Sequence, residues 1–259
     1  MIPRALCLLL LAAAPAAAQT PAPPPSAAGG VEFLSRFDYE FGLEHLVSDD
    51  PRFVWDAVFG GDLDLIDYER GRLTFAAEYD ATLGSEYQPF DPNQGNYMLE
   101  GALSARAGKV ELSAVYHHVS RHLGDRPKRD PVDWNMIGGR VRGGLTRGRT
   151  ELQGRADLRR AIQRTFVDYR WELEADTHAR VALRPRVSAV VLGGVRVIGV
   201  DGSRGRGTQY GGRAEGGLRL DGRASGLVLF VAVERRIDPY QLEFSHVTWL
   251  TMGFRLVGR

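Results

Sequence analysis

Alternation of apolar and polar residues over unusually long segments is the feature that most constrains this chain. In residues 167–181 the odd positions are mainly apolar and aromatic, and the even positions are almost all charged. Successive side chains of a β-strand point to opposite faces, so this segment predicts a strand with one apolar and one charged face. Such segments run to about 10 to 14 residues, whereas strands of soluble proteins have about 5 to 6. Tilted strands of about ten residues are the length that a bilayer-spanning barrel requires.

The same pattern recurs along the chain after Val31. It predicts strands near 37–44, 55–67, 73–83, 96–106, 109–120, 134–145, 151–158, 167–181, 187–199, 209–221, 225–235 and 247–257. Short connections such as 68–71 alternate with longer ones such as 121–133, which is the rhythm of periplasmic turns and extracellular loops. The sequence therefore predicts an all-β fold, an antiparallel up-and-down transmembrane β-barrel of about twelve strands over residues 31–259. A soluble β-sandwich is the alternative, and strand length and loop rhythm favour the barrel.

The N-terminus predicts secretion. Arg4 is followed by an apolar run and then by alanines at 16–18, which is the pattern of a signal peptide over residues 1–18. Residues 19–30 are rich in proline and alanine, as expected of a flexible periplasmic tail. The single cysteine, Cys7, lies in the signal, so the mature chain has no thiol chemistry. Together with the strand pattern, this predicts a location in the bacterial outer membrane.

The charge balance excludes one class of partner. The chain has 33 Lys+Arg and 32 Asp+Glu, and removal of the signal with Arg4 makes the two counts equal. A neutral chain of this kind predicts no nucleic-acid binding. The lumen of a narrow barrel would be filled largely by paired arginines and carboxylates. The expected partners are outer-membrane lipids and the machinery that assembles barrels.

One group of residues could carry chemistry. On the predicted strand 109–120, the apolar face continues into His118 and Ser120, side by side at the extracellular end. On the next strand the apolar face leads back to Asn135, at the same end. A histidine beside a serine can act as its base, and a third group can orient the histidine. The pattern predicts a catalytic Ser120, His118 and Asn135 on the outer wall, unless they are simply polar residues at the membrane interface.

Two resemblances bear on this group. His-Val-Ser at 118–120, followed by Asp-Pro at 130–131 and Trp-Asn at 134–135, resembles the active-site region of outer-membrane phospholipase A. That resemblance implies a twelve-stranded barrel with a Ser-His-Asn site on its outer face, a calcium ion near the oxyanion and a homodimer. Lipid A 3-O-deacylases carry a similar His-x-Ser. In the phospholipase Asn-Gly follows the serine, whereas Arg121 and His122 stand here, so no calcium ligands are assigned.

Residues 118–125 also resemble a His-x-Ser-Ser-His-Leu-Gly-Asp string in a family of uncharacterised outer-membrane proteins, which implies the barrel and no activity. His122, Asp125 and Asp130 fall in the predicted loop 121–133, where solvated polar residues are ordinary. Two functions remain open at this point. One is an interfacial hydrolase acting on phospholipid or lipid A acyl chains, and the other is a non-enzymatic structural, adhesive or narrow transport barrel.

Overall fold

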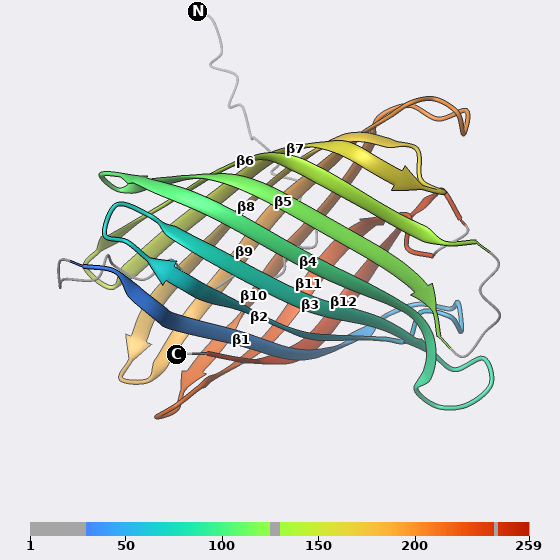
Figure 1. Ribbon diagram of the computed structural model, residues 1–259. Coiled ribbons are helices and arrows are strands. Elements are labelled where there is room, and N and C mark those ends of the chain that lie inside the picture. Colours follow the sequence, from blue (N-terminus) through green and yellow to red (C-terminus); the bar gives the residue numbers. More distant parts are fainter. Residues whose placement is uncertain (1–29, 125–129, 241–242, 259) are drawn as a thin grey trace, which may run out of the picture.

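Twelve strands form one closed barrel in the computed structural model, which describes residues 30–124, 130–240 and 243–258 (Figure 1). Within these residues the strands are β1 (Glu32–Leu46), β2 (Trp55–Asp67), β3 (Arg72–Gly84), β4 (Asp91–Ala107), β5 (Val110–Leu123), β6 (Val132–Arg147), β7 (Thr150–Thr165), β8 (Tyr169–Arg184), β9 (Val187–Val200), β10 (Gln209–Asp221), β11 (Gly226–Ile237) and β12 (His246–Val257). Each strand pairs antiparallel with the next, and β12 closes the barrel against β1. The predicted fold class and strand count are confirmed.

The predicted signal peptide at 1–18, and residues 19–29 of the predicted tail, lie outside the described residues. No helix in the described ranges is long and apolar enough to cross a membrane.

Short turns mark one end of the barrel. Gly108 and Gly148 open two of them with φ angles of 63° and 61°, a region that glycine adopts without strain. The end of β12 lies at this same end (Figure 1). Longer connections, such as residues 201–208, lie at the other end. Because outer-membrane barrels keep their short turns in the periplasm, the longer connections are extracellular.

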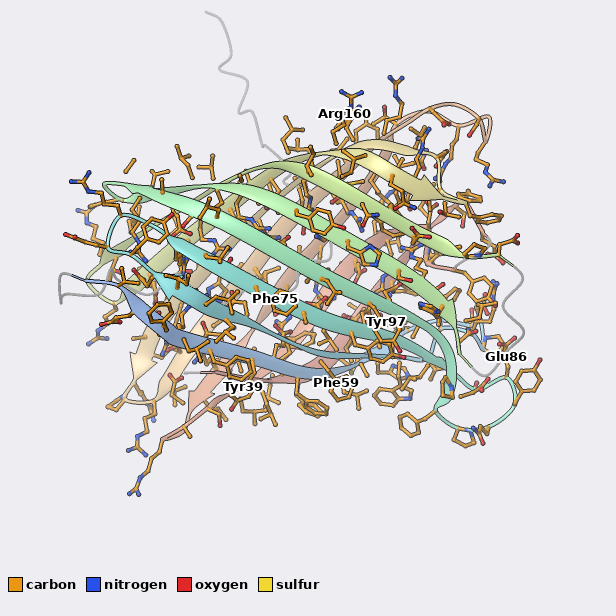
Figure 2. The ribbon with its side chains drawn as sticks, viewed as in Figure 1. Tyr39, Phe59, Phe75, Glu86, Tyr97 and Arg160 are labelled. Atoms are coloured by element: carbon orange, nitrogen blue, oxygen red, sulfur yellow. The ribbon has the colours of Figure 1, made fainter. Side chains whose placement is uncertain are left out.

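The wall is apolar outside and charged inside. On β5, Leu112 is 49% exposed, whereas its neighbour Glu111 is 8% exposed and faces the lumen. Phe59 and Tyr97 likewise stand on the outer face (Figure 2). In water this arrangement would leave a large apolar surface unburied, whereas in a bilayer the apolar belt meets lipid and every strand has a paired neighbour.

Several strands extend further toward the extracellular side than the sequence pattern predicts. β4 begins at Asp91 rather than near residue 96, and Gly95 pairs with His122 in β5. The prediction that a loop begins at residue 121 is therefore wrong, and His122 belongs to a strand. In the extension of β5 the outward residue is the polar His122, so the apolar and polar alternation that marks a strand fades there.

Ion pairs fill the middle of the lumen. Arg159 contacts Glu172 and Glu174 and lies 3.5 Å from Glu100. Arg140 Nη1 donates to Glu100 Oε1 at 2.6 Å. These side chains are almost fully buried, which confirms the predicted filling of a narrow lumen by paired charges.

An apolar cluster packs in the lumen near its extracellular end. Its members are Val119, Val132, Trp134, Met136, Tyr169, Ile198 and Ile237. Polar contacts tie it to the loops: Tyr169 donates to Asp238 at 2.7 Å, and Arg206 binds both Asp168 and Asp238. Burial opposes the charge on Arg206, but the two carboxylates hold the pKa of this guanidinium above its usual value. We call this arrangement the extracellular plug.

The ion pairs across the lumen and the extracellular plug predict a barrel that does not conduct ions. Reconstituted into planar bilayers, the protein is expected to give no stable single-channel steps in concentrated KCl, under conditions where a general porin does. Regular steps of constant size would contradict the packing of the lumen.

Candidate functional site

The outward face of β5 carries a row of polar residues at its extracellular end. Alternation holds along the strand, so Tyr116, His118, Ser120 and His122 all face outward, and the residues between them face the lumen. His118 and Ser120 are partly exposed. The predicted orientation of both residues therefore agrees with the structure.

Asn135 lies directly beside His118. The two residues are register partners between β5 and β6, and His118 Nδ1 lies 2.7 Å from Asn135 Oδ1. Tyr116 donates its hydroxyl to the same oxygen at 2.8 Å. Because an amide oxygen can only accept, this contact requires a proton on His118 Nδ1, and in the neutral ring Nε2 is then the acceptor.

Ser120 contacts the other neighbouring histidine. Its Oγ lies 2.8 Å from His122 Nε2, and no hydrogen bond joins it to His118. His122 also stands edge-on to the ring of Tyr97, at a centroid distance of 5.3 Å. The structure thus brings His118 to Asn135 and Ser120 to His122, with both histidines two residues from the serine on one face. Sequence reasoning missed His122 because it assigned this residue to a loop.

Gln163 on β7 is a second residue that the sequence did not indicate. Asn135 donates its amide to Gln163, and Gln163 donates to Asp133 at 2.8 Å. A register shift between β6 and β7 beside Asn135 turns Gln163 outward, although strict alternation from Leu158 would point it into the lumen. The polar group on the outer wall therefore spans three strands. We call Tyr116, His118, Ser120, His122, Asp133, Asn135 and Gln163 the outer-wall cluster.

The outer-wall cluster does not fit a calcium ion. Calcium takes six to eight oxygen ligands. Here Asn135 Oδ1 already accepts from Tyr116 and His118, and Asp133 Oδ1 accepts from Gln163. Among the described residues no group of three or more histidine, cysteine or acidic side chains could hold a metal.

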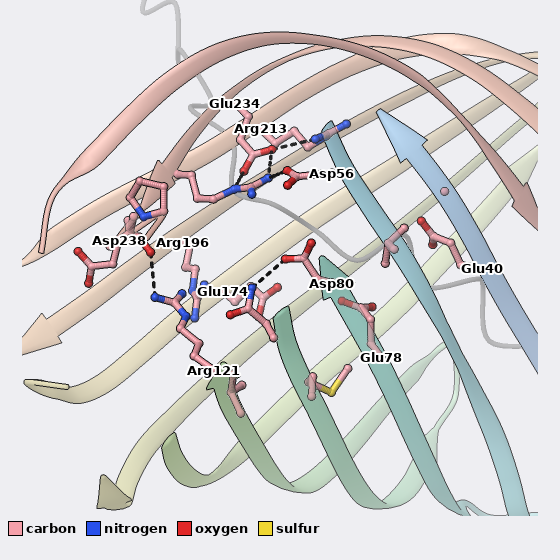
Figure 3. A pocket seen from close by; sticks show the side chains of 18 of the residues that line it. Glu40, Asp56, Glu78, Asp80, Arg121, Glu174, Arg196, Arg213, Glu234 and Asp238 are labelled. Atoms are coloured by element: carbon pink, nitrogen blue, oxygen red, sulfur yellow. Dashed lines mark hydrogen bonds and ion pairs between the residues drawn. The ribbon is translucent and has the colours of Figure 1, made fainter. Parts of the chain in front are cut away.

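A separate cavity of about 210 Å³ remains in the lumen (Figure 3). Glu78 and Asp80 line one side of it, and Arg196 and Arg213 come from other strands. Ser120, His118 and Asn135 do not line this cavity, because they lie on the opposite face of the sheet. The lumen cavity and the outer-wall cluster are therefore distinct.

Comparisons with known proteins bear on the fold. No protein-family model matches the chain, and a search of curated proteins gives no match. Outer membrane phospholipase A from Escherichia coli has a TM-score of 0.53 at 12% identity, covering 86% of this chain and 92% of that chain. An outer membrane channel from Pseudomonas putida F1 has a TM-score of 0.54 at 12% identity, covering 93% of this chain and 99% of that chain. The Salmonella typhi outer membrane phospholipase dimer with bound calcium has a TM-score of 0.51 at 13% identity, covering 86% and 90%.

At such identities these likenesses concern the fold alone, and a phospholipase and a channel share it equally. These three structural neighbours are bacterial outer-membrane barrels, in agreement with the apolar outer wall, so the predicted location in the bacterial outer membrane is confirmed. The catalytic roles of Ser120, His118 and Asn135 stay a prediction.

Proposed function

We propose that this outer-membrane barrel is an interfacial lipid acyl hydrolase, with Ser120 as nucleophile, His118 as general base and Asn135 as the residue that orients His118. The observation that carries the proposal is the 2.7 Å contact between His118 Nδ1 and Asn135 Oδ1, with Ser120 two residues away on the same outward face. This contact selects the histidine tautomer whose Nε2 can take a proton from a hydroxyl.

The first step needs one side-chain rotation. Ser120 lies between His118 and His122 on one face of β5, so a change of its χ1 rotamer turns Oγ from one histidine toward the other. Turned toward His118, Oγ gives its proton to Nε2 and attacks the acyl carbonyl carbon. His118 then donates this proton to the leaving alcohol oxygen as the ester C–O bond breaks. A water that loses its proton to His118 attacks the acyl-serine carbonyl carbon, and His118 gives this proton to Ser120 Oγ as the acyl–oxygen bond breaks and the fatty acid leaves.

The surroundings of the site favour a substrate held in the membrane. Leu99 pairs with His118 and Tyr97 pairs with Ser120 on β4, and both partners are apolar or aromatic side chains exposed on the outer wall. A lipid acyl chain can lie along such residues while its ester reaches the serine. The ion pairs across the lumen and the extracellular plug disfavour transport as the alternative.

The test is release of fatty acid by the folded barrel. Refolded protein is mixed with phospholipid vesicles or with lipid A, with calcium and with a chelator, and free fatty acid is measured against protein unfolded by heat. Release by the folded barrel alone supports the hydrolase and identifies its substrate class. No release from either lipid in any condition would leave a non-enzymatic barrel.

The two histidines are expected to differ in importance. His118→Ala removes the oriented base and should reduce the hydrolysis rate by about 10² to 10⁴-fold. His122→Ala removes a hydrogen bond that Ser120 must break before it turns toward His118, so the hydrolysis rate should change by no more than about fivefold. The hydrolysis rates of both variants in the vesicle assay show which histidine acts as the base. A larger loss in His122→Ala would transfer the role of base to His122.

A further inference from the structure

Two arginines on the outer wall differ from the arginines of the lumen. Arg160 on β7 and Arg170 on β8 are exposed, and within the described part of the chain neither makes a hydrogen bond or ion pair. By contrast, Arg159, the neighbour of Arg160, faces the lumen and contacts two glutamates there. Carboxylates therefore pair with Arg159 in the lumen, whereas Arg160 on the outer wall has no such partner among the described residues.

The two arginines occupy neighbouring positions of the barrel wall. Arg160 pairs with Trp171 across β7 and β8, and Arg170 directly precedes Trp171. A register shift between Tyr169 and Trp171 leaves Arg170 in an irregular position, with Tyr169 buried in the lumen and Trp171 on the outer wall. Trp171 lies against Gly199, where any side chain would collide with the indole ring. Two long side chains on adjoining register positions can reach one ligand.

The position along the barrel corresponds to lipid headgroups. Arg160 points away from the wall, at a level along the barrel similar to that of Tyr97, the register partner of Ser120 (Figure 2). Trp171 beside Arg160 is the kind of side chain that occupies the membrane interface. An unpaired arginine is costly on a lipid-facing wall and is tolerated where it reaches the headgroups.

We propose that Arg160 and Arg170 form a binding site for the phosphate group of an anionic membrane lipid. Each guanidinium presents a planar fork of donors that matches two phosphate oxygens, and two forks supply two positive charges. A zwitterionic headgroup carries its own positive ammonium group, so it should bind the two arginines more weakly than an anionic headgroup does. The site adjoins the outer-wall cluster, because Gln163 lies three residues beyond Arg160 on β7. It does not depend on catalysis at Ser120.

Binding of a defined lipid tests the proposal without any assay of activity. Full barrel folded in detergent micelles is titrated with short-chain phosphatidylglycerol or phosphatidylcholine, and bound lipid is counted by native mass spectrometry. We expect wild type to prefer phosphatidylglycerol, and Arg160→Gln with Arg170→Gln to bind it about tenfold more weakly. Binding of phosphatidylcholine should not change, and inorganic phosphate at the same concentration should not displace the lipid.

The matched control removes two arginines from the periplasmic end, Arg147→Gln with Arg149→Gln, which changes the net charge equally. This control should bind phosphatidylglycerol as wild type does. Circular dichroism confirms that each variant is folded before titration. Equal affinity of the Arg160 and Arg170 variant and wild type, or an equal loss in the control, would overturn the site, whatever the fatty acid assay shows.

Discussion

Ser120→Ala is expected to reduce release of fatty acid by at least about 10³-fold, because removal of the nucleophile from a serine and histidine pair costs rates of this order or more. The variant should fold as wild type does, since Ser120 is partly exposed and its one side-chain hydrogen bond goes to His122. The rate is measured on the lipid that wild type hydrolyses best.

Ser113→Ala is the matched control for this variant. It removes a hydroxyl from the same strand, but from the face that points into the lumen. Its rate should equal that of wild type. A Ser120→Ala barrel that keeps full activity would remove Ser120 from the mechanism, and any hydrolysis would then come from another group.

Arg159→Met is expected to lower the free energy of unfolding by about 3 to 5 kcal/mol, the usual cost of removing one partner from a buried ion pair. Arg159 is 2% exposed and contacts Glu172 and Glu174. Methionine fills similar space but leaves these carboxylates with fewer donors, although Arg196 still binds Glu172 and Arg155 still binds Glu174. Denaturant unfolding of the barrel in micelles measures the change.

Arg147→Met serves as the comparison for Arg159→Met. Arg147 is exposed at the end of β6, so its replacement should change the free energy of unfolding by no more than about 0.5 kcal/mol. Equal effects of the two substitutions would mean that the lumen ion pairs contribute little, and that the wall pairing alone sustains the barrel.

The wall of the barrel was predictable from the sequence because side chains alternate between the two faces of each strand. Along β5 every second residue meets lipid, so Leu112 and Tyr116 reveal the outward face without knowledge of any partner strand. The ion pairs of the lumen were predictable only as a class. Which glutamate contacts Arg159 depends on the curvature of the closed sheet. The order of residues along the chain does not reveal this curvature.

The candidate site was also predictable only in part. The contact between His118 and Asn135 followed from alternation and from the pairing of β5 with β6. His122 was missed because β5 continues past the apolar signal. Gln163 was missed because a register shift turns its side chain from the lumen to the outer face, and the sequence near Gln163 does not indicate that shift.

The measurement that tests the central claim most directly is covalent labelling of the folded barrel with a fluorophosphonate probe, read by mass spectrometry of its peptides. Such probes bond to serines whose hydroxyl is activated by a base. The account predicts one phosphonate adduct, on Ser120, which is absent from the heat-unfolded chain and strongly reduced in His118→Ala. A folded barrel that carries no adduct on Ser120, or whose labelling is unchanged by His118→Ala, would contradict it.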